Sequence, residues 1–342
     1  VDLPAADFIT EITSTQRSIS EQGLKKSSAK LIPADSVVVS TRATIGRVAI
    51  NRVEMATNQG FKNIVIENRT RAIPEYVALA VTRLTQTMEA WATGGTFKEI
   101  SKSRFCELEI PLPPLEVQKE VVAEIEGYQK VIDGARAVVE NYRPMIPINP
   151  EWPIGRIGDV CTLVSGQHIA SGDYNREGIG TPYLTGPADF GFEHPLVTKW
   201  TTKPKVFAQR GDILITVKGS GIGKVNLLNE EQVAISRQLM AIRANQAVPR
   251  FVYFFLRQKY EHLNNLGDGA AIPGITREQI LSLALPLPDV GVQEEIVAEI
   301  EMDRSAVATN LTLIKRLERR IQATLARVWG DEETQATEET EE

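Results

Sequence analysis

The sequence repeats a 17-residue segment, and the two copies begin 175 residues apart. Ile110 to Glu126 reads IPLPPLEVQKEVVAEIE and Leu285 to Glu301 reads LPLPDVGVQEEIVAEIE, with 11 identical positions. Pro74 and Pro249 stand at the same spacing, so the repeat extends upstream. Because solenoid repeats have periods of about 20 to 50 residues, a spacing this long predicts two domain-sized copies.

Both copies have the same order of parts: short β-type runs, a helix opened by proline, a proline-rich connector and a long helix. Copy one is predicted to form a strand, a turn and a second strand from Arg47 within Ser36–Val48, and copy two repeats this within Asp212–Leu228. The further strands and the short helices are expected at Asn63–Ile66, Leu239–Ile242, Pro74–Ala90 and Pro249–Leu263. The pattern predicts an α/β (α+β) fold with two pseudo-symmetric domains.

The connectors IPLPPL and LPLPDV are predicted to be extended, because proline at alternate positions removes N–H donors and disfavours the helical region. Beyond them, apolar residues recur at steps of four and three, which is a heptad seam. The seam residues are Val121, Ile125, Tyr128, Ile132, Val139 and Tyr142 in copy one, and Ile296, Ile300, Val307, Ile314, Leu317 and Ile321 in copy two. The seams favour pairing of the two helices with each other; packing of each helix on its own domain is the alternative.

Length and composition fit a globular protein of about two domains. The cysteines Cys106 and Cys161 form neither a disulfide framework nor a zinc motif, which favours a reducing cytoplasm and two packed thiols. The chain contains no apolar run near the roughly 20 residues that span a bilayer. We therefore expect a cytoplasmic protein without a membrane partner.

Charge is unevenly distributed along the chain. The segment Asp331–Glu342 holds seven of the acidic residues and no basic one, so the net charge of -6 arises in this tail and the rest is about neutral. Leu196–Tyr260 carries 11 Lys or Arg against three acidic residues, and Gln16–Arg83 carries 11 against five. Each copy thus has a basic half, which is typical of nucleic-acid binding, although ordinary solvated surface charge gives the same count.

Three local features of the sequence bear on enzymatic chemistry. Gly219–Lys224 (GSGIGK) lacks the Ser/Thr of a phosphate-binding loop, because position 225 is Val, and is predicted to be a strand-connecting turn whose glycines could also approach a phosphate. Asn149–Trp152 (NPEW) departs from the adenine-methyltransferase motif at Glu151 and is interpreted as a linker. The scattered histidines His168, His194 and His262 support neither metal ligation nor acid-base chemistry. The sequence therefore predicts no catalytic residue, no metal and no cofactor.

Several segments together resemble the specificity subunits of type I restriction-modification systems. They are GLKKSSAKLIP (Gly23–Pro33), STRATIGRVAI (Ser40–Ile50), ATNQGFKNI (Ala56–Ile64), EIPLPPLEVQKEVVAEIE (Glu109–Glu126) and their counterparts in copy two. The resemblance covers nearly the whole chain. It implies a non-catalytic subunit with two target recognition domains, each reading one half of a split DNA site. It also implies that the two helices form an antiparallel coiled coil that separates the domains and binds methyltransferase subunits, two of them, with restriction subunits joining through the complex.

The resemblance implies this division: target recognition domain 1 at 1–110, connector and spacer helix 1 at 111–148, target recognition domain 2 at 149–285, connector and spacer helix 2 at 286–330, and a disordered acidic tail at 331–342. Copy two opens with Trp152–Gly166, whereas copy one begins at Val1, so domain 1 is expected to lack about 30 residues of the repeat. Two alternatives stay open. One is the specificity tail of a fused methyltransferase-nuclease polypeptide, and the other is a protein-interaction scaffold that does not bind DNA.

Arg and Lys read guanine and Asn and Gln read adenine in the DNA major groove, so polar loops with these residues are the candidate DNA-binding positions. They are Lys25, Lys26, Arg42, Thr44, Arg47, Gln59, Lys62 and Lys98 in copy one, and Lys203, Lys205, Lys218, Ser220, Lys224, Arg237 and Gln238 in copy two. The loops Gly94–Lys98 and Gly267–Ala271 occupy corresponding places and either line the groove or serve as flexible connectors.

Overall fold

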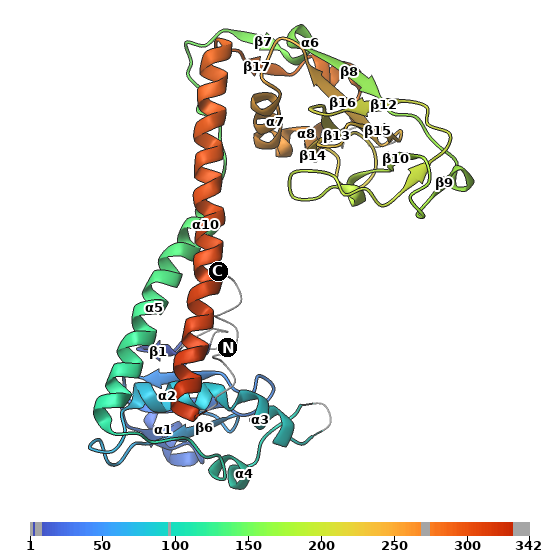
Figure 1. Ribbon diagram of the computed structural model, residues 1–342. Helices are drawn as coiled ribbons and strands as arrows, with labels where there is room; N and C mark the ends of the chain where they lie inside the picture. Colours follow the sequence, from blue (N-terminus) through green and yellow to red (C-terminus); the bar gives the residue numbers. More distant parts are fainter. Residues whose placement is uncertain (1–2, 4–8, 95–96, 268–273, 331–342) are drawn as a thin grey trace. The chain divides into compact units, whose positions relative to one another are not determined.

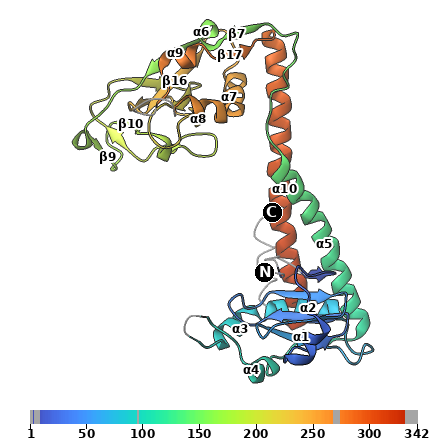
Figure 2. The same ribbon diagram turned by 180° about the vertical axis from the view of Figure 1, so that it is seen from behind.

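The structure is a computed structural model that describes residues 3, 9–94, 97–267 and 274–330. The chain divides into two compact units, residues 1–140 with 309–342 and residues 141–308. The boundary falls inside the helix α10 (Val290–Trp329), so this helix belongs to both units (Figure 1, Figure 2). The predicted acidic tail 331–342 lies outside the described residues, as do residues 95–96 and 268–271 of the two predicted loops.

The first unit is built on a four-stranded sheet in the order β1-β4-β3-β6. Its elements are β1 (Thr10–Ile12), α1 (Glu21–Lys26), β2 (Leu31–Ile32), β3 (Ser36–Ser40), β4 (Val48–Asn51), β5 (Met55–Ala56), β6 (Phe61–Ile64), α2 (Pro74–Arg83), α3 (Thr85–Trp91), α4 (Lys102–Cys106) and α5 (Leu115–Asn141). Val37 and Val39 on β3 and Val77 and Val81 on α2 form the core between the sheet and α2. Alternate side chains of β3 thus face the helix, as the period of two in a strand requires.

The second unit contains two larger sheets, β14-β13-β16-β8 and β12-β15-β10-β11-β9. Its elements are β7 (Ile154–Arg156), α6 (Ile157–Val160), β8 (Cys161–Ser165), η1 (Ser171–Asp173), β9 (Tyr174–Asn175), β10 (Thr181–Leu184), η2 (Pro187–Asp189), β11 (Trp200–Thr201), β12 (Phe207–Gln209), β13 (Ile213–Thr216), β14 (Val225–Leu227), β15 (Gln232–Ile235), β16 (Leu239–Ala244), α7 (Pro249–Gln258), α8 (Tyr260–Leu266), α9 (Arg277–Leu281) and β17 (Ala284–Pro286). Ile213 and Ile215 pack with α7, while Leu214 packs with β15 residues of the five-stranded sheet. The four-stranded sheet is therefore covered on both faces.

The predicted strand, turn and strand are confirmed in both units, with β4 starting at Val48, one residue later than expected. The short helices differ from the prediction, because each is two helices that break at Leu84 and at Lys259. In each unit a glycine of the strand-connecting loop lies where the second helix packs. Thr85 at the start of α3 lies against Gly46, and Leu263 on α8 lies against Gly223, so the second helix of each pair turns to pack on the strand-connecting loop.

The helices α5 and α10 pair antiparallel within the first unit; the heptad pattern predicted the pairing, and the family resemblance implied its direction. Two ion pairs give the direction, because Arg136 bonds Glu318 at 2.7 Å and Glu124 bonds Arg327 at 3.0 Å. Thr324 also donates to Glu124 at 3.0 Å. Burial opposes ionisation of Glu124, but the hydrogen bonds from Thr324 and other partners outweigh it and lower the pKa of this carboxyl. The pair thus has polar contacts along its apolar seam.

The predicted seam residues are divided between two cores. Those in the core shared by α5, α10 and α2 are Val121, Ile125, Ile132, Ile314, Leu317 and Ile321, with Tyr128 and Val139 half-buried against them. Ile296 and Ile300 instead pack with Phe254 and its neighbours in the second unit, which is the own-domain packing that stood as the alternative. Tyr142 donates to the Ile300 carbonyl at 3.1 Å, and Val307 is half-buried. The start of α10 therefore belongs to its domain and its end to the helix pair.

The two cysteines differ in burial. Cys161 on β8 is buried, and burial raises its pKa to about 11. Cys106 on α4 is exposed, contrary to the expectation of two packed thiols. The difference has a structural cause, because Cys106 lines a hollow in the first unit.

Candidate nucleic-acid interface

A glycine-rich turn joins β13 to β14 in the second unit. Gly219, Gly221 and Gly223 have φ values of 87°, 87° and 84°, in the region that favours glycine. The N–H of Thr216 donates to the Lys224 carbonyl at 2.9 Å and closes the turn. The loop connects two antiparallel strands, so the predicted strand-connecting turn is confirmed.

A second loop lies against this turn, between β15 and β16. The N–H of Val217 donates to the Gln238 carbonyl at 2.8 Å. A side-chain carbon placed on Gly186 would lie 2.1 Å from the Gln238 side-chain oxygen, so glycine at this position leaves room for Gln238 in its observed conformation. Together the two loops form what we call the second loop patch, whose exposed side chains are those of Lys218, Ser220, Lys224, Arg237 and Gln238.

A buried ion pair lies next to the backbone segment that carries part of the second loop patch. Lys199 bonds Asp189 at 2.6 Å and Thr185 at 2.9 Å, and Asp189 is 4% exposed. Burial opposes ionisation of Asp189, but hydrogen bonds from Lys199 and Thr185 outweigh it and lower its pKa. Ser236, which precedes Arg237, donates to the Thr185 carbonyl at 2.6 Å. These contacts fix the backbone segment that carries Arg237 and Gln238.

The first unit places a corresponding set of polar side chains after β3. Arg42 and Lys62 lie 3.8 Å and 3.6 Å from Glu99, and the N–H of Ala43 donates to the Lys98 carbonyl at 3.2 Å. The N–H of Thr41 donates to Gly60 at 2.8 Å and so brings the next loop alongside. We call this set the first loop patch; it consists of Arg42, Thr44, Gln59, Lys62 and Lys98.

The remaining DNA-binding candidates lie apart from the two patches. Arg47 donates to the Leu3 carbonyl at 2.9 Å and so binds its own unit. Lys25 and Lys26 are exposed on the last turn of α1. Lys203 pairs with Asp173 at 2.6 Å and Lys205 donates to the His168 carbonyl at 2.8 Å, both between β11 and β12. The structure thus groups ten of the 15 candidates into two patches.

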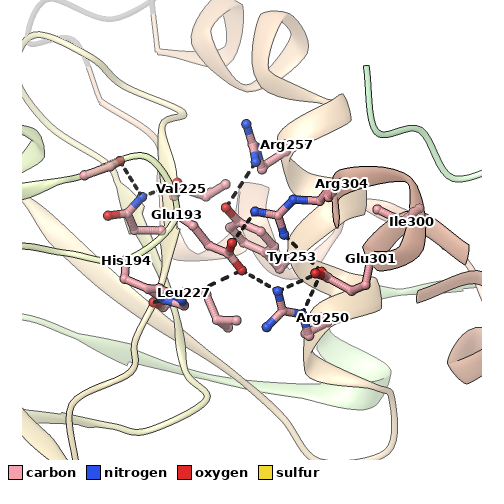
Figure 3. A network of polar contacts seen from close by, with 12 residues as sticks. Glu193, His194, Val225, Leu227, Arg250, Tyr253, Arg257, Ile300, Glu301 and Arg304 are labelled. Carbon is pink, nitrogen blue, oxygen red and sulfur yellow. Dashed lines mark hydrogen bonds and ion pairs between the residues drawn. The ribbon is translucent and has the colours of Figure 1, made fainter. Parts of the chain in front are cut away.

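A polar network connects the loop after η2 to the helices α7 and α10 (Figure 3). Glu193 accepts from Arg250 at 2.5 Å and forms an ion pair with Arg304, and Glu301 bonds the same two arginines at 2.7 Å and 3.0 Å. Burial opposes ionisation of Glu193, but the hydrogen bond from Arg304 and the charge of Arg250 outweigh it and lower its pKa. The Leu227 N–H, at the end of β14, donates to the backbone carbonyl of Glu193 at 2.8 Å, so this network lies beside the strand that follows the glycine-rich turn.

The two patches offer hydrogen-bond donors without reactive groups around them. Lysine, arginine and glutamine side chains suit phosphate oxygens and the edges of bases.

Among the described residues, His, Cys, Asp and Glu side chains do not gather in groups of three or more that could hold a metal ion. Within the same ranges, every helix is too short or too polar to cross a lipid bilayer. The arrangement is that of a binding surface.

The two α/β units share three strands in the same pairing, β4-β3-β6 and β14-β13-β16, and each has exposed polar side chains on the loop after the first of these strands, β3 or β13, so together they define a duplicated binding module. The family model for the type I restriction modification DNA specificity domain matches residues 5–136 and 149–319. The chain belongs to this family.

Solved structures agree with this fold. The HsdS subunit from Thermoanaerobacter tengcongensis is 26% identical, with a TM-score of 0.55 over 87% of this chain and 81% of that one. A chain solved in work on complex assembly and conformational transition of the type I R-M system is 26% identical, with a TM-score of 0.61 over 90% of this chain and 85% of that one.

The sequence relatives are matched over shorter stretches. The type I restriction enzyme MjaIX specificity subunit of Methanocaldococcus jannaschii is 24% identical over 210 residues, which is 54% of this chain. The chain spans about half the length of the curated relatives it matches, at 54% and 48% for two of them.

Proposed function

We propose that the chain is a DNA sequence-specificity subunit that recognises a bipartite target and directs methyltransferase and restriction subunits to it. One observation carries the proposal: the loops that follow the corresponding strands β3 and β13 both carry exposed hydrogen-bond donors, among them Arg42 and Lys218. A split DNA target presents two separate sets of base edges, and a duplicated recognition module matches that demand.

Electrostatics support the proposal. In the second loop patch Lys218, Lys224 and Arg237 are exposed, and glycines allow backbone N–H groups to come close to a phosphate. Gln238 is exposed as well and can pair with adenine in the manner of a bidentate amide. The first loop patch is less basic, because Glu99 lies beside Arg42 and Lys62. We therefore expect the second unit to contribute more of the salt-dependent affinity.

The proposed domain roles follow the predicted boundaries. Residues 1–110 and 149–285 act as the recognition domains, and the helices at 111–148 and 286–330 act as spacer and docking surface for methyltransferase subunits, two per chain. The restriction subunits join through that complex, and all catalysis resides in these partners. The names of the relatives, which are specificity subunits of type I restriction enzymes, support this assignment. The proposed site of action is the cytoplasm.

Binding measured across a salt series tests the proposal. The chain, assembled with its methyltransferase subunits, is titrated with fluorescent target DNA between 50 and 200 mM salt, conditions over which six to ten phosphate contacts cost about 10³ to 10⁵ in affinity. Lys218→Glu with Lys224→Glu should weaken binding and flatten the salt slope. Lys102→Glu, at an exposed lysine on α4 outside both loop patches and outside the two long helices, is the control and should leave the slope unchanged. An affinity independent of salt would contradict DNA binding.

A further inference from the structure

A tight hairpin follows η2 in the second unit and carries an exposed phenylalanine at its tip. Phe190 and Pro195 form an antiparallel bridge, and the Gly191 N–H donates to the His194 carbonyl at 3.1 Å. Phe192 stands between them and is 82% exposed, more than any other large apolar side chain among the described residues. Because single exposed apolar residues are ordinary on a protein surface, exposure alone assigns no role to Phe192. Its role is indicated by what holds the hairpin and by what lies beside the ring.

The tip of the hairpin is held by the residues that follow Phe192. The Leu227 N–H donates to the Glu193 carbonyl at 2.8 Å, and Nδ1 of His194 lies 2.7 Å from the Leu227 carbonyl oxygen. The Glu193 side chain is 12% exposed and bonds the arginines of α7 and α10 (Figure 3). A charged side chain is thus buried and paired while its apolar neighbour is exposed, which reverses the usual preference. The exposure of Phe192 is therefore set by a fixed backbone.

An arginine of α7 orients the ring of Phe192. The guanidinium carbon of Arg257 lies 5.6 Å from the centre of the Phe192 ring and 5.6 Å from the centre of the Tyr253 ring. Arg257 also donates to the Tyr253 hydroxyl at 3.3 Å, and Tyr253 is 0% exposed. A guanidinium over an aromatic face is attracted to the negative face of the ring. One face of Phe192 is therefore taken by Arg257, and the remaining ring surface is exposed to a ligand.

The Phe192 ring borders the second loop patch. It lines a hollow of about 410 Å³, whose walls also include Arg257, Tyr260, Gly223 and Lys224. Lys224 is one of the exposed donors of the second loop patch, and Gly223 belongs to the same glycine-rich turn. DNA that contacts Lys224 therefore comes within reach of Phe192.

A phenylalanine ring matches one feature of the DNA major groove. The edges of adenine, guanine and cytosine present hydrogen-bond donors and acceptors, whereas thymine adds an apolar C5-methyl group to its acceptor. Phenylalanine neither donates nor accepts, so a polar base edge that it covers loses its hydrogen bonds to water without replacement. Against a methyl group the same ring removes apolar surface from water on both sides. A phenylalanine among base-reading donors therefore favours thymine.

We propose that Phe192 is a specificity-determining residue that contacts the C5-methyl group of a thymine in the half-site read by the second unit. The inference rests on the proposed function, because it requires the second loop patch to lie in the major groove. The donors of the patch read polar base edges, and Phe192 reads the methyl group beside them. Removal of that methyl group should weaken binding about fourfold, as expected for one buried methyl group.

Deoxyuridine is the probe, because it differs from thymidine only in lacking the C5-methyl group. The target is taken from the methylation motif of the assembled complex, and each thymine of the two half-sites is replaced singly in a fluorescent duplex. For the chain assembled with its methyltransferase subunits, replacement at one position should weaken binding about fourfold, and Phe192→Ala should abolish this difference. Ile179→Ala, at an isoleucine that is 60% exposed and outside the hollow, is the control and should retain it.

The outcomes separate this inference from the proposed function. Equal affinity for thymine and deoxyuridine at every position, a motif without A·T pairs, or a fourfold loss that persists in Phe192→Ala would overturn the role of Phe192. Sequence-specific binding by the wild-type complex would in those cases leave the proposed function intact. A wild-type complex that does not prefer its target to unrelated DNA would overturn both. Weaker assembly of Phe192→Ala with the methyltransferase subunits in the absence of DNA would identify a protein contact and would also overturn the inference.

Discussion

Gln118 and Gln293 stand at the same position of the two repeats and make the same pair of hydrogen bonds. Gln118 accepts from the Ile73 N–H at 3.2 Å and donates to the Pro113 carbonyl at 2.8 Å. Gln293 accepts from the Val248 N–H at 2.9 Å and donates to the Pro288 carbonyl at 2.8 Å. Each glutamine thereby joins the start of a long helix to its connector and to the residue that precedes the proline-opened helix. In both units this contact fixes the long helix to the domain that precedes it in the chain.

Replacement of this glutamine should destabilise the unit that contains it. Gln293 is 2% exposed, so Gln293→Leu leaves the buried Pro288 carbonyl and the half-buried Val248 N–H without these hydrogen bonds. We expect the free energy of unfolding of the second unit to fall by about 1 to 3 kcal/mol. The control Gln322→Leu replaces an exposed glutamine on α10. Urea-dependent hydrogen exchange of β13 and β16 measures the effect, and an equal loss in both variants would contradict it.

The repeat indicated that these two glutamines are equivalent but not what they bond. Identity between copies at Gln118 and Gln293 is visible in the sequence. Their partners, the N–H groups of Ile73 and Val248, lie 45 residues upstream. A contact over that distance depends on how the helix returns to the domain, and no local pattern encodes it.

The ion pair of Glu193 with Arg304 should make the second unit sensitive to acid. The folded-state pKa of Glu193 lies below its ordinary value of 4.5. Its contribution is therefore complete above the unfolded-state pKa and is lost as the pH falls through the folded-state pKa. Glu193→Gln should cost about 1.5 to 3 kcal/mol at pH 7, as is usual for a hydrogen bond to a charged group.

The comparison of this variant with the wild-type protein isolates Glu193 from other carboxyl groups. Unfolding of the second unit is followed between pH 3 and 7, and the difference in stability should shrink as the pH falls below about 4.5. Glu177→Gln, at an exposed carboxyl group, is the control and should track the wild-type protein. A difference that is constant with pH would mean that Glu193 contributes through packing rather than charge.

The elements of the fold could be predicted wherever the signal is local. Proline positions located the starts of α2 and α7, and short runs of β-branched residues located β3 and β13. The heptad pattern predicted one seam, but it could not separate the two partners of α10. Ile300 packs on its own domain and Ile314 packs on α5, and both side chains satisfy the same spacing.

The candidate site, like the fold, could be predicted only where its signal is local in the sequence. Polar residues in a glycine-rich turn identified Lys218 and Lys224 as candidates. The groups that support them are single charged residues without a motif: Asp189 and Lys199 lie ten residues apart, and Glu193 and Arg304 lie 111 residues apart. Only their burial in the folded unit distinguishes them from ordinary surface charge.

The paired helices should set the length of the unread gap in the DNA target. One heptad inserted into α5 after Gln129 and one into α10 after Arg320 preserve the seam and add about 10.5 Å at 1.5 Å per residue. We expect the gap to lengthen by about three base pairs at 3.4 Å each, while the bases that are read stay the same. Sequencing of methylated sites measures this. An unchanged gap would mean that the helices are packed for stability alone.

The most direct test of the account is the methylation motif of the assembled complex in cells that lack other methyltransferases. We expect a bipartite motif for the wild-type chain. Lys218→Ala, Lys224→Ala and Arg237→Ala together should abolish discrimination in one half, at about 1 to 3 kcal/mol per lost base contact, and leave the other half intact. Arg42→Ala with Lys98→Ala should affect only the other half. A single uninterrupted motif, or equal loss in both halves with either variant, would contradict the assignment of one half-site to each unit.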